Sequence, residues 1–191
     1  MGTGSLSGYA TPGQTWTFFE VNPAIERIAR DPRLFTYLRD CAKGATVILG
    51  DARLSLARAG NGQFDLIVLD AFSSDAIPVH LMTREALQLY LEKLSPTGAL
   101  AFHITNRHLN LQPLMASLAD SSGLLGLVQI DGNVTAAEQA AGKLSSIWVV
   151  MARQRQDLGD LVLDRRWQPS TSAGIPVWTD DYSDIFSLFR W

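Results

Sequence analysis

Short apolar and β-branched runs alternate with stretches of helical periodicity along most of this chain, and that alternation restricts the possible folds more than any other feature. The expected strands are residues 15–19, 46–49, 64–69, 99–104, 124–130 and 146–151. The expected helices are residues 24–30, 32–38, 52–59, 83–94 and 111–118. Strands and helices that alternate at this spacing predict an α/β domain with a mainly parallel sheet.

Two stretches depart from this regular pattern. Residues 131–143 are polar and contain glycine, and we expect them to form a mobile loop. The tail from residue 153 onward is less regular and carries three tryptophans, which more often anchor a tail to a core or a partner than stack on a ligand. The strand at 64–69 is the most apolar, so we expect it to be buried on both faces of the sheet.

Composition excludes several classes of protein. Hydrophobic residues make up 47% of the 191 residues and charged residues 18%, which argues against disorder. The net charge of −3 leaves no basic footprint for nucleic acid. One cysteine, Cys41, excludes an internal disulfide and a cysteine-cluster metal site. No apolar run reaches the roughly 18 residues of a membrane span, so we expect a cytoplasmic protein without membrane contact.

Polar and glycine residues follow the predicted strands at the positions where ligands bind. In open parallel sheets, ligands lie beyond the carboxyl ends of the strands. The residues at or just after such ends are Gly2, Gly4, Glu20, Asp51, Asp70 and Asn106. We therefore expect these residues to lie at one edge of the sheet.

The first four of these residues each allow two interpretations. Gly2 and Gly4 can bring backbone N–H groups close to a ligand, or they can belong to a frayed terminus. Glu20 lies where a carboxylate binds ribose hydroxyls, about 20 residues beyond a glycine turn, and is otherwise a solvated strand-end residue. Asp51 is either a helix N-cap or a polar contact to a base, and these two roles compete.

The segment from Asp70 to Pro78 carries the strongest chemical signal. Asp70 ends the most apolar strand, where a carboxylate needs hydrogen bonds or has a functional role. Asp75 follows in a loop that contains two serines. A pair of aspartates that only cap or brace the loop explains the segment equally well.

The histidines and the cysteine carry weaker signals. His80, His103 and His108 have no spacing that matches a metal-ligand motif, so we expect no metal site. Packing or loop hydrogen bonds are the expected roles, with His80 a candidate for lining a pocket. Cys41 has no base near it in sequence and is expected to be an ordinary thiol.

These segments together resemble a known family. Gly2–Ser5, Phe19–Pro23, Gly50–Arg53 and Leu69–Asp75 occur in the order seen in spermidine synthase-like proteins, the aminopropyltransferase branch of the S-adenosylmethionine-dependent methyltransferase superfamily. Trp178–Tyr182 resembles the endings of a bacterial branch of such proteins. The resemblance covers most of the chain and implies a Rossmann-like methyltransferase fold with flanking helices.

The resemblance also implies a domain organisation. Residues 1–152 would form a Rossmann-like nucleoside-binding domain whose first strand is missing, so that the chain is N-terminally truncated. Residues 153–191 would form a C-terminal tail that packs on the domain or on a partner. Because a lost strand exposes sheet edges and apolar surface, we expect a homo-oligomer, with a dimer the simplest case.

The implied activity is aminopropyl transfer from decarboxylated S-adenosylmethionine to a small-molecule amine, a step of polyamine biosynthesis, with no tightly bound cofactor. The residues carried over to the nucleoside are Gly2 and Gly4 beside its methionine part, Glu20 at its ribose, and Asp51 with Ala52 at its adenine.

Asp70 matches the aspartate that accepts a proton from the attacking amine, and Asp75 the second aspartate of the same loop. Ala71-Phe72 and Ala76 depart from the family's usual Asp-Ser-Ser-Asp-Pro loop, so the amine is not identified. Methyl transfer from S-adenosylmethionine is the alternative reaction, and a non-catalytic nucleoside-binding or assembly domain is the alternative class.

Overall fold

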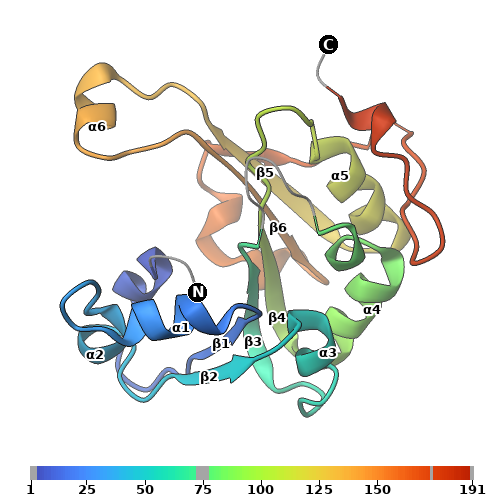
Figure 1. Cartoon of the computed structure of the whole chain (residues 1–191). Coiled ribbons are helices and arrows are strands. Elements are labelled where there is room, and N and C mark those ends of the chain that lie inside the picture. Colours follow the sequence, from blue (N-terminus) through green and yellow to red (C-terminus); the bar gives the residue numbers. More distant parts are fainter. Residues whose placement is uncertain (1–3, 72–77, 173, 190–191) are drawn as a thin grey trace. The chain divides into compact units, whose positions relative to one another are not determined.

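The computed structural model describes residues 4–71, 78–172 and 174–189, and the chain forms two compact units, Met1–Ala59 and Gly60–Trp191 (Figure 1). Two predicted site residues, Gly2 and Asp75, lie outside the described residues. In the described ranges, every helix is too short or too polar to span a bilayer. The predicted domain boundary after residue 152 stays a prediction.

The first unit contains two parallel strands and three helices. Its elements are β1 (Thr17–Glu20), α1 (Pro23–Arg30), α2 (Tyr37–Asp40), β2 (Thr46–Leu49) and α3 (Ala52–Leu56). The register pairs Glu20 with Leu49, so both strands end at the same level. Helix α1 begins where the sequence predicts, because the Asn22 side chain accepts the Ala24 N–H at 2.9 Å.

Gly4 starts the first unit with a backbone conformation that favours glycine. Its φ of 69° opens a 3-10 turn over Ser5–Tyr9, and its carbonyl accepts the Ser7 hydroxyl at 2.6 Å. A Cβ at this position would overlap the ring of Tyr37. The Tyr37 ring also meets Phe18 edge-to-face at 6.2 Å. Gly4 is therefore required by the packing of the first unit.

The second unit is a five-stranded sheet in the order β3-β4-β6-β5-β7. Its strands are β3 (Phe64–Leu69), β4 (Leu94–His103), β5 (Leu125–Asp131), β6 (Ser146–Ala152) and β7 (Trp167–Pro169). Its helices are α4 (Arg84–Lys93), α5 (Gln112–Ser121) and α6 (Ala136–Ala140). β3 and β4 are parallel, whereas β6 pairs antiparallel with β4 and β5, and β7 pairs antiparallel with β5.

Strand β6 shows how this sheet is buried from both sides. Val149 and Met151 are 0% exposed, and Val150 and Ala152 alternate with them along the strand. Val150 and Ala152 pack with Leu158, which lies in the 3-10 segment that follows β6. Helices α4 and α5 lie on one side of the sheet and that segment on the other (Figure 1).

Strand β3 has the predicted bounds but not the predicted burial. Leu69 is 7% exposed, whereas Leu66 is 55% exposed. The prediction of burial on both faces is wrong for the first half of the strand. The reason is its place in the sheet, since β4 is its neighbour among the described strands of the second unit and its other edge is not paired there.

The connection between β5 and β6 contains a helix where the sequence predicts only a loop. Thr135 and Glu138 form a reciprocal capping box that starts α6. Lys143 lies 3.1 Å from Asp131 and 3.0 Å from Glu138. Figure 1 shows this connection extending away from the five-stranded sheet.

The C-terminal tail packs on the second unit. β7 pairs with β5, and Trp178 is 0% exposed. The Trp178 carbonyl accepts the backbone N–H of Arg84 at 2.9 Å. Thr83, which caps α4, donates its hydroxyl to Asp180 at 2.7 Å. The tail segment singled out in the sequence thus anchors to the start of α4.

Candidate active site

In the first unit, two predicted ligand-binding carboxylates follow neighbouring strands. Glu20 ends β1, and Asp51 comes two residues after β2 ends. The Gly50 N–H donates to the Glu20 carbonyl at 2.9 Å, which extends the pairing beyond β2. The structure therefore brings these two residues to one edge of the parallel pair, as predicted.

Glu20 is half-buried and bonded to its own chain. Its Oε1 accepts the backbone N–H of Asn22 at 2.9 Å. Burial raises the pKa of the Tyr37 hydroxyl, and the negative charge of Glu20 raises it further. Glu20 therefore lies close enough to influence the Tyr37 hydroxyl, whose ring also packs against Gly4.

Asp51 is the N-cap of α3. Its Oδ1 accepts the Leu54 N–H at 2.8 Å, and Ala52 is the first residue of the helix. The capping interpretation of Asp51 is confirmed. A contact from Asp51 and Ala52 to adenine stays a prediction, as does the contact of Gly4 to the methionine part of a nucleoside.

In the second unit, Asp70 lies beside a histidine of the next strand. Leu69 pairs with Phe102 in the parallel register, so Asp70 and His103 follow at equivalent positions. Asp70 Oδ1 lies 2.7 Å from His103 Nδ1. The Asp70 side chain is 51% exposed and that of His103 is 26% exposed, so this hydrogen-bonded pair reaches solvent.

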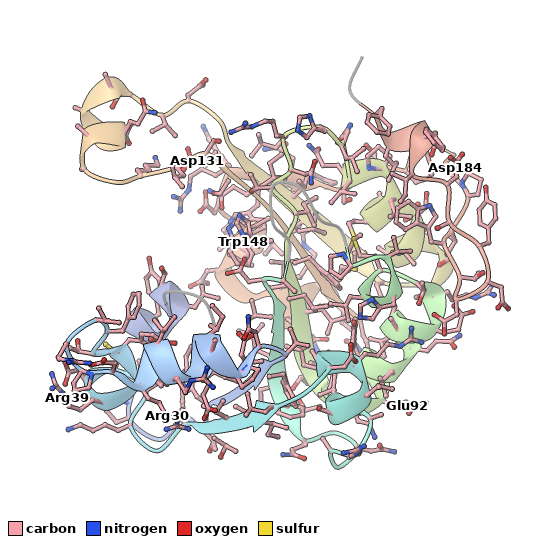
Figure 2. The ribbon with its side chains drawn as sticks, viewed as in Figure 1. Arg30, Arg39, Glu92, Asp131, Trp148 and Asp184 are labelled. Carbon is pink, nitrogen blue, oxygen red and sulfur yellow. The ribbon has the colours of Figure 1, made fainter. Side chains whose placement is uncertain are left out.

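Three neighbours hold the His103 ring. The Thr105 hydroxyl lies 2.8 Å from Nε2 on the opposite side of the ring from Asp70. The Thr105 oxygen in turn accepts the backbone N–H of Ile147 at 2.8 Å. Trp148, labelled in Figure 2, stacks on the imidazole with ring centroids 4.7 Å apart and planes 17° apart. The ring is fixed at both nitrogens and on one face.

The pairing of Asp70 with His103 was not predicted, although the sequence contains a signal for it. Residues 64–69 and 99–104 are consecutive strands, and each is followed or ended by a polar residue. Aligning the carboxyl ends of these two predicted strands pairs Asp70 with Thr105, whereas the observed register pairs Leu69 with Phe102 and so brings Asp70 beside His103. The sequence predicted a packing or hydrogen-bonding role for His103 and favoured His80 as a pocket-lining residue, and His80 is exposed.

Two other polar candidates have local structural roles. The Asn106 side chain accepts the backbone N–H groups of His108 at 2.9 Å and Leu109 at 2.8 Å. Asn106 therefore braces the turn after β4.

Cys41 is an exposed free thiol. Within the described ranges, no three His, Cys, Asp or Glu side chains are grouped as metal ligands.

Comparison with known proteins finds similarity to spermidine synthases. A polyamine aminopropyltransferase from Vibrio vulnificus (strain CMCP6) is 42% identical over 83 residues, which are 42% of this chain and 26% of that protein. A probable spermidine synthase from Corynebacterium glutamicum ATCC 13032 superposes with a TM-score of 0.56 at 15% identity, over 87% of this chain and 64% of that one. Spermidine synthase from Thermotoga maritima superposes with a TM-score of 0.51 at 10% identity, over 92% of this chain and 56% of that one. No family model matches the chain.

These comparisons confirm the predicted resemblance to spermidine synthase-like proteins and the Rossmann-like α/β fold. The structural similarity, at 10% and 15% identity, bears on the fold alone. The match to the curated relative spans 26% of its length, and the chain covers 64% and 56% of the two solved structures. The activity proposed for this chain therefore rests on its own residues.

Proposed function

We propose that this chain is a spermidine synthase-like aminopropyltransferase that uses decarboxylated S-adenosylmethionine and a small-molecule amine. The observation that carries the proposal is Asp70, a half-exposed carboxylate at the carboxyl end of a parallel strand and held in place by His103. The sequence match to a polyamine aminopropyltransferase supports the reaction class.

The reaction makes modest demands on the protein. A neutral amine nitrogen attacks the aminopropyl carbon bonded to the sulfonium, and an N–C bond forms. The C–S bond breaks with its electron pair going to sulfur, which leaves neutral methylthioadenosine. The proton lost by the amine passes to the Asp70 carboxylate. Alignment of the reactants and this proton transfer are the contributions that we assign to the chain.

We assign nucleoside recognition to the first unit. Glu20 would accept the ribose hydroxyls, and Asp51 with Ala52 would contact adenine. The parallel pairing that ends both strands at one edge supports this assignment. Both carboxylates are already oriented by backbone N–H groups, which reduces the side-chain freedom that binding would have to remove.

The test is product analysis with the purified chain. Incubation with decarboxylated S-adenosylmethionine and putrescine, or another diamine, is expected to release methylthioadenosine together with the aminopropylated amine. Asp70→Asn is expected to abolish this release. Asp65→Asn is the matched control, because Asp65 lies in the same strand and its carboxylate accepts the Ser95 hydroxyl at 2.9 Å instead.

Other outcomes contradict the proposal in distinct ways. Formation of S-adenosylhomocysteine from ordinary S-adenosylmethionine would indicate a methyltransferase of the same fold. Calorimetric binding of methylthioadenosine without turnover of any diamine would indicate a non-catalytic nucleoside-binding domain. Retained activity in Asp70→Asn would remove Asp70 from the mechanism.

We also propose that the chain self-associates. Leu66 of β3 is 55% exposed, and Tyr9 and Val21 of the first unit are 80% and 72% exposed. Exposed apolar side chains of this size, and an edge of β3 that is paired with none of the described strands of the second unit, favour a partner surface. Sedimentation at micromolar concentration is expected to show a dimer, and a compact monomer would contradict this proposal.

A further inference from the structure

The hydrogen-bonded series that joins Asp70, His103 and Thr105 is not part of the resemblance on which the function rests. We propose that His103 is the positioning residue of Asp70, and that Thr105 sets the protonation of the His103 ring so that Nδ1–H holds the carboxylate. This inference rests on the proposed function, because it assumes that Asp70 accepts the proton of the amine.

The donors and acceptors in this series determine where the protons lie. The Ile147 N–H donates to the Thr105 oxygen at 2.8 Å and occupies one of its two lone pairs. An ionised Asp70 carboxylate can only accept, so a neutral His103 ring carries its proton on Nδ1, toward Asp70 Oδ1 at 2.7 Å. His103 Nε2 then accepts the Thr105 hydroxyl proton at 2.8 Å.

The sheet makes this arrangement rigid. Strand pairing places His103 opposite Trp148, and the stacked indole restricts rotation of the imidazole. The Ile104 N–H donates to the Ile147 carbonyl at 2.9 Å, which continues the pairing past the end of β4. The positioning group is therefore built on two paired strands, which hold a side chain more precisely than a loop does.

The consequence for Asp70 is orientation. Among the described residues, the hydrogen bond to its carboxylate comes from His103 and uses Oδ1. Oδ2 is then the oxygen available to the amine. A donor on Oδ1 limits side-chain rotation, so that the second oxygen keeps one direction while the side chain is half-exposed.

The order of carboxylate, imidazole and hydroxyl is the same as in the serine hydrolases, and the distances fall in the same range. The Thr105 hydroxyl differs because its oxygen accepts a backbone N–H from the neighbouring strand. That bond ties the Thr105 side chain to the neighbouring strand, and we assign it the role of orienting the ring.

The first test reads the tautomer by NMR in the full chain labelled with ¹⁵N-histidine. The chain has three histidines, and the signal that disappears in His103→Asn assigns His103. We expect the Nδ1–H tautomer for His103 at neutral or higher pH. Thr105→Ser is expected to keep it and Thr105→Val to lose it. An Nε2–H tautomer in the unaltered chain would overturn the proposal.

The second test compares two His103 variants in the aminopropyl-transfer assay. His103→Leu removes the donor and is expected to lower kcat about tenfold to a hundredfold, the range for losing one hydrogen bond to a charged group, with KM for the nucleoside unchanged. His103→Asn keeps an amide N–H near the Nδ1 position and is expected to recover most of that loss. Thermal unfolding of both variants reports whether the fold is intact.

The outcomes separate this inference from the proposed function. If the unaltered chain transfers aminopropyl groups and His103→Leu is as active, the inference fails while the function stands. If both variants lose activity equally although both are folded, His103 is not acting through a donated N–H. If no diamine is turned over by the unaltered chain, the proposed function fails, and the inference that rests on it fails as well.

Discussion

The carboxylates that follow strands in the two units are held in different ways. In the first unit, Glu20 and Asp51 bond to backbone N–H groups two and three residues further along the chain. In the second unit, Asp70 bonds to the side chain of His103, 33 residues away. The first arrangement depends on local turns, and the second depends on the pairing of two strands.

In the proposed function, this difference corresponds to one between residues oriented for binding and a residue oriented for chemistry. A backbone N–H is always protonated, so it holds a carboxylate without responding to its state. An imidazole has two nitrogens whose protons depend on their partners, so its bond to Asp70 can be set by Thr105. Recognition residues suit the first kind of support, and a proton acceptor suits the second.

The largest expected effect is on Asp70. Replacing its carboxylate in Asp70→Asn removes a general base, which typically lowers the rate about 10²-fold to 10⁴-fold. We expect that loss in kcat, measured as methylthioadenosine released under saturating donor and amine. Asp65→Asn is expected to stay within about twofold, since surface substitutions away from special features change little. A similar loss in both variants would indicate a general effect of charge on the strand.

Glu20→Gln is expected to affect binding instead of turnover. The substitution removes the charged carboxylate that would accept hydrogen bonds from the ribose hydroxyls. Loss of one hydrogen bond to a charged group weakens binding about tenfold or more. KM for the nucleoside donor should rise by about that factor while kcat changes little. Glu26→Gln in α1, which removes the negative charge that lies 2.8 Å from Arg30, is the control. A fall in kcat alone would contradict the division between the units.

Asp51 can be tested for its two roles with two substitutions. Asparagine caps helices about as well as aspartate, so Asp51→Asn should leave the free energy of unfolding unchanged. Asp51→Ala should lower the free energy of unfolding by about 1 kcal/mol. If Asp51 also contacts adenine, both variants weaken the binding of methylthioadenosine in calorimetry. Unchanged affinity in Asp51→Asn would leave Asp51 as a cap only.

The smallest expected effect concerns Glu138, a third carboxylate with mainly local support. Bonds from the Thr135 backbone and hydroxyl, and then from Lys143, lower its pKa from 4.5 to about 2. A lowered pKa in the folded chain stabilises α6 above pH 4.5, and this contribution is lost as the pH falls from 4.5 toward 2. The protection of α6 amides relative to their intrinsic exchange rates should decrease over that range, and Glu138→Gln should remove the dependence.

Much of the fold was predictable because it depends on local patterns. The bounds of β2 and β3 were predicted without error from apolar runs, and Asn22, Asp51 and Thr83 cap helices where the sequence indicates. These signals lie within a few residues of the structure that they determine. The tail was also expected to anchor through a tryptophan, and Trp178 does so.

The predictions fail where contacts between residues far apart in the sequence determine the secondary structure. The strand expected over residues 99–104 begins at Leu94 in the structure and runs through Pro96 and Gly98. Gly98 is needed there because a Cβ would come within 2.9 Å of the Asp65 carbonyl on the neighbouring strand. β7 was missed because its three residues form a strand only by pairing with β5.

By itself, the sequence determined the alternation of strands and helices, the caps, and the identity of Glu20, Asp51 and Asp70 as strand-end carboxylates. Those features follow from side-chain periodicity and from hydrogen bonds within one turn of the chain. Only the tertiary structure decided that Asp70 is paired with His103, and that Thr105 and Trp148 fix the ring. The physical reason is that strand register brings together residues that are far apart in sequence, and no local pattern records which side chains will meet.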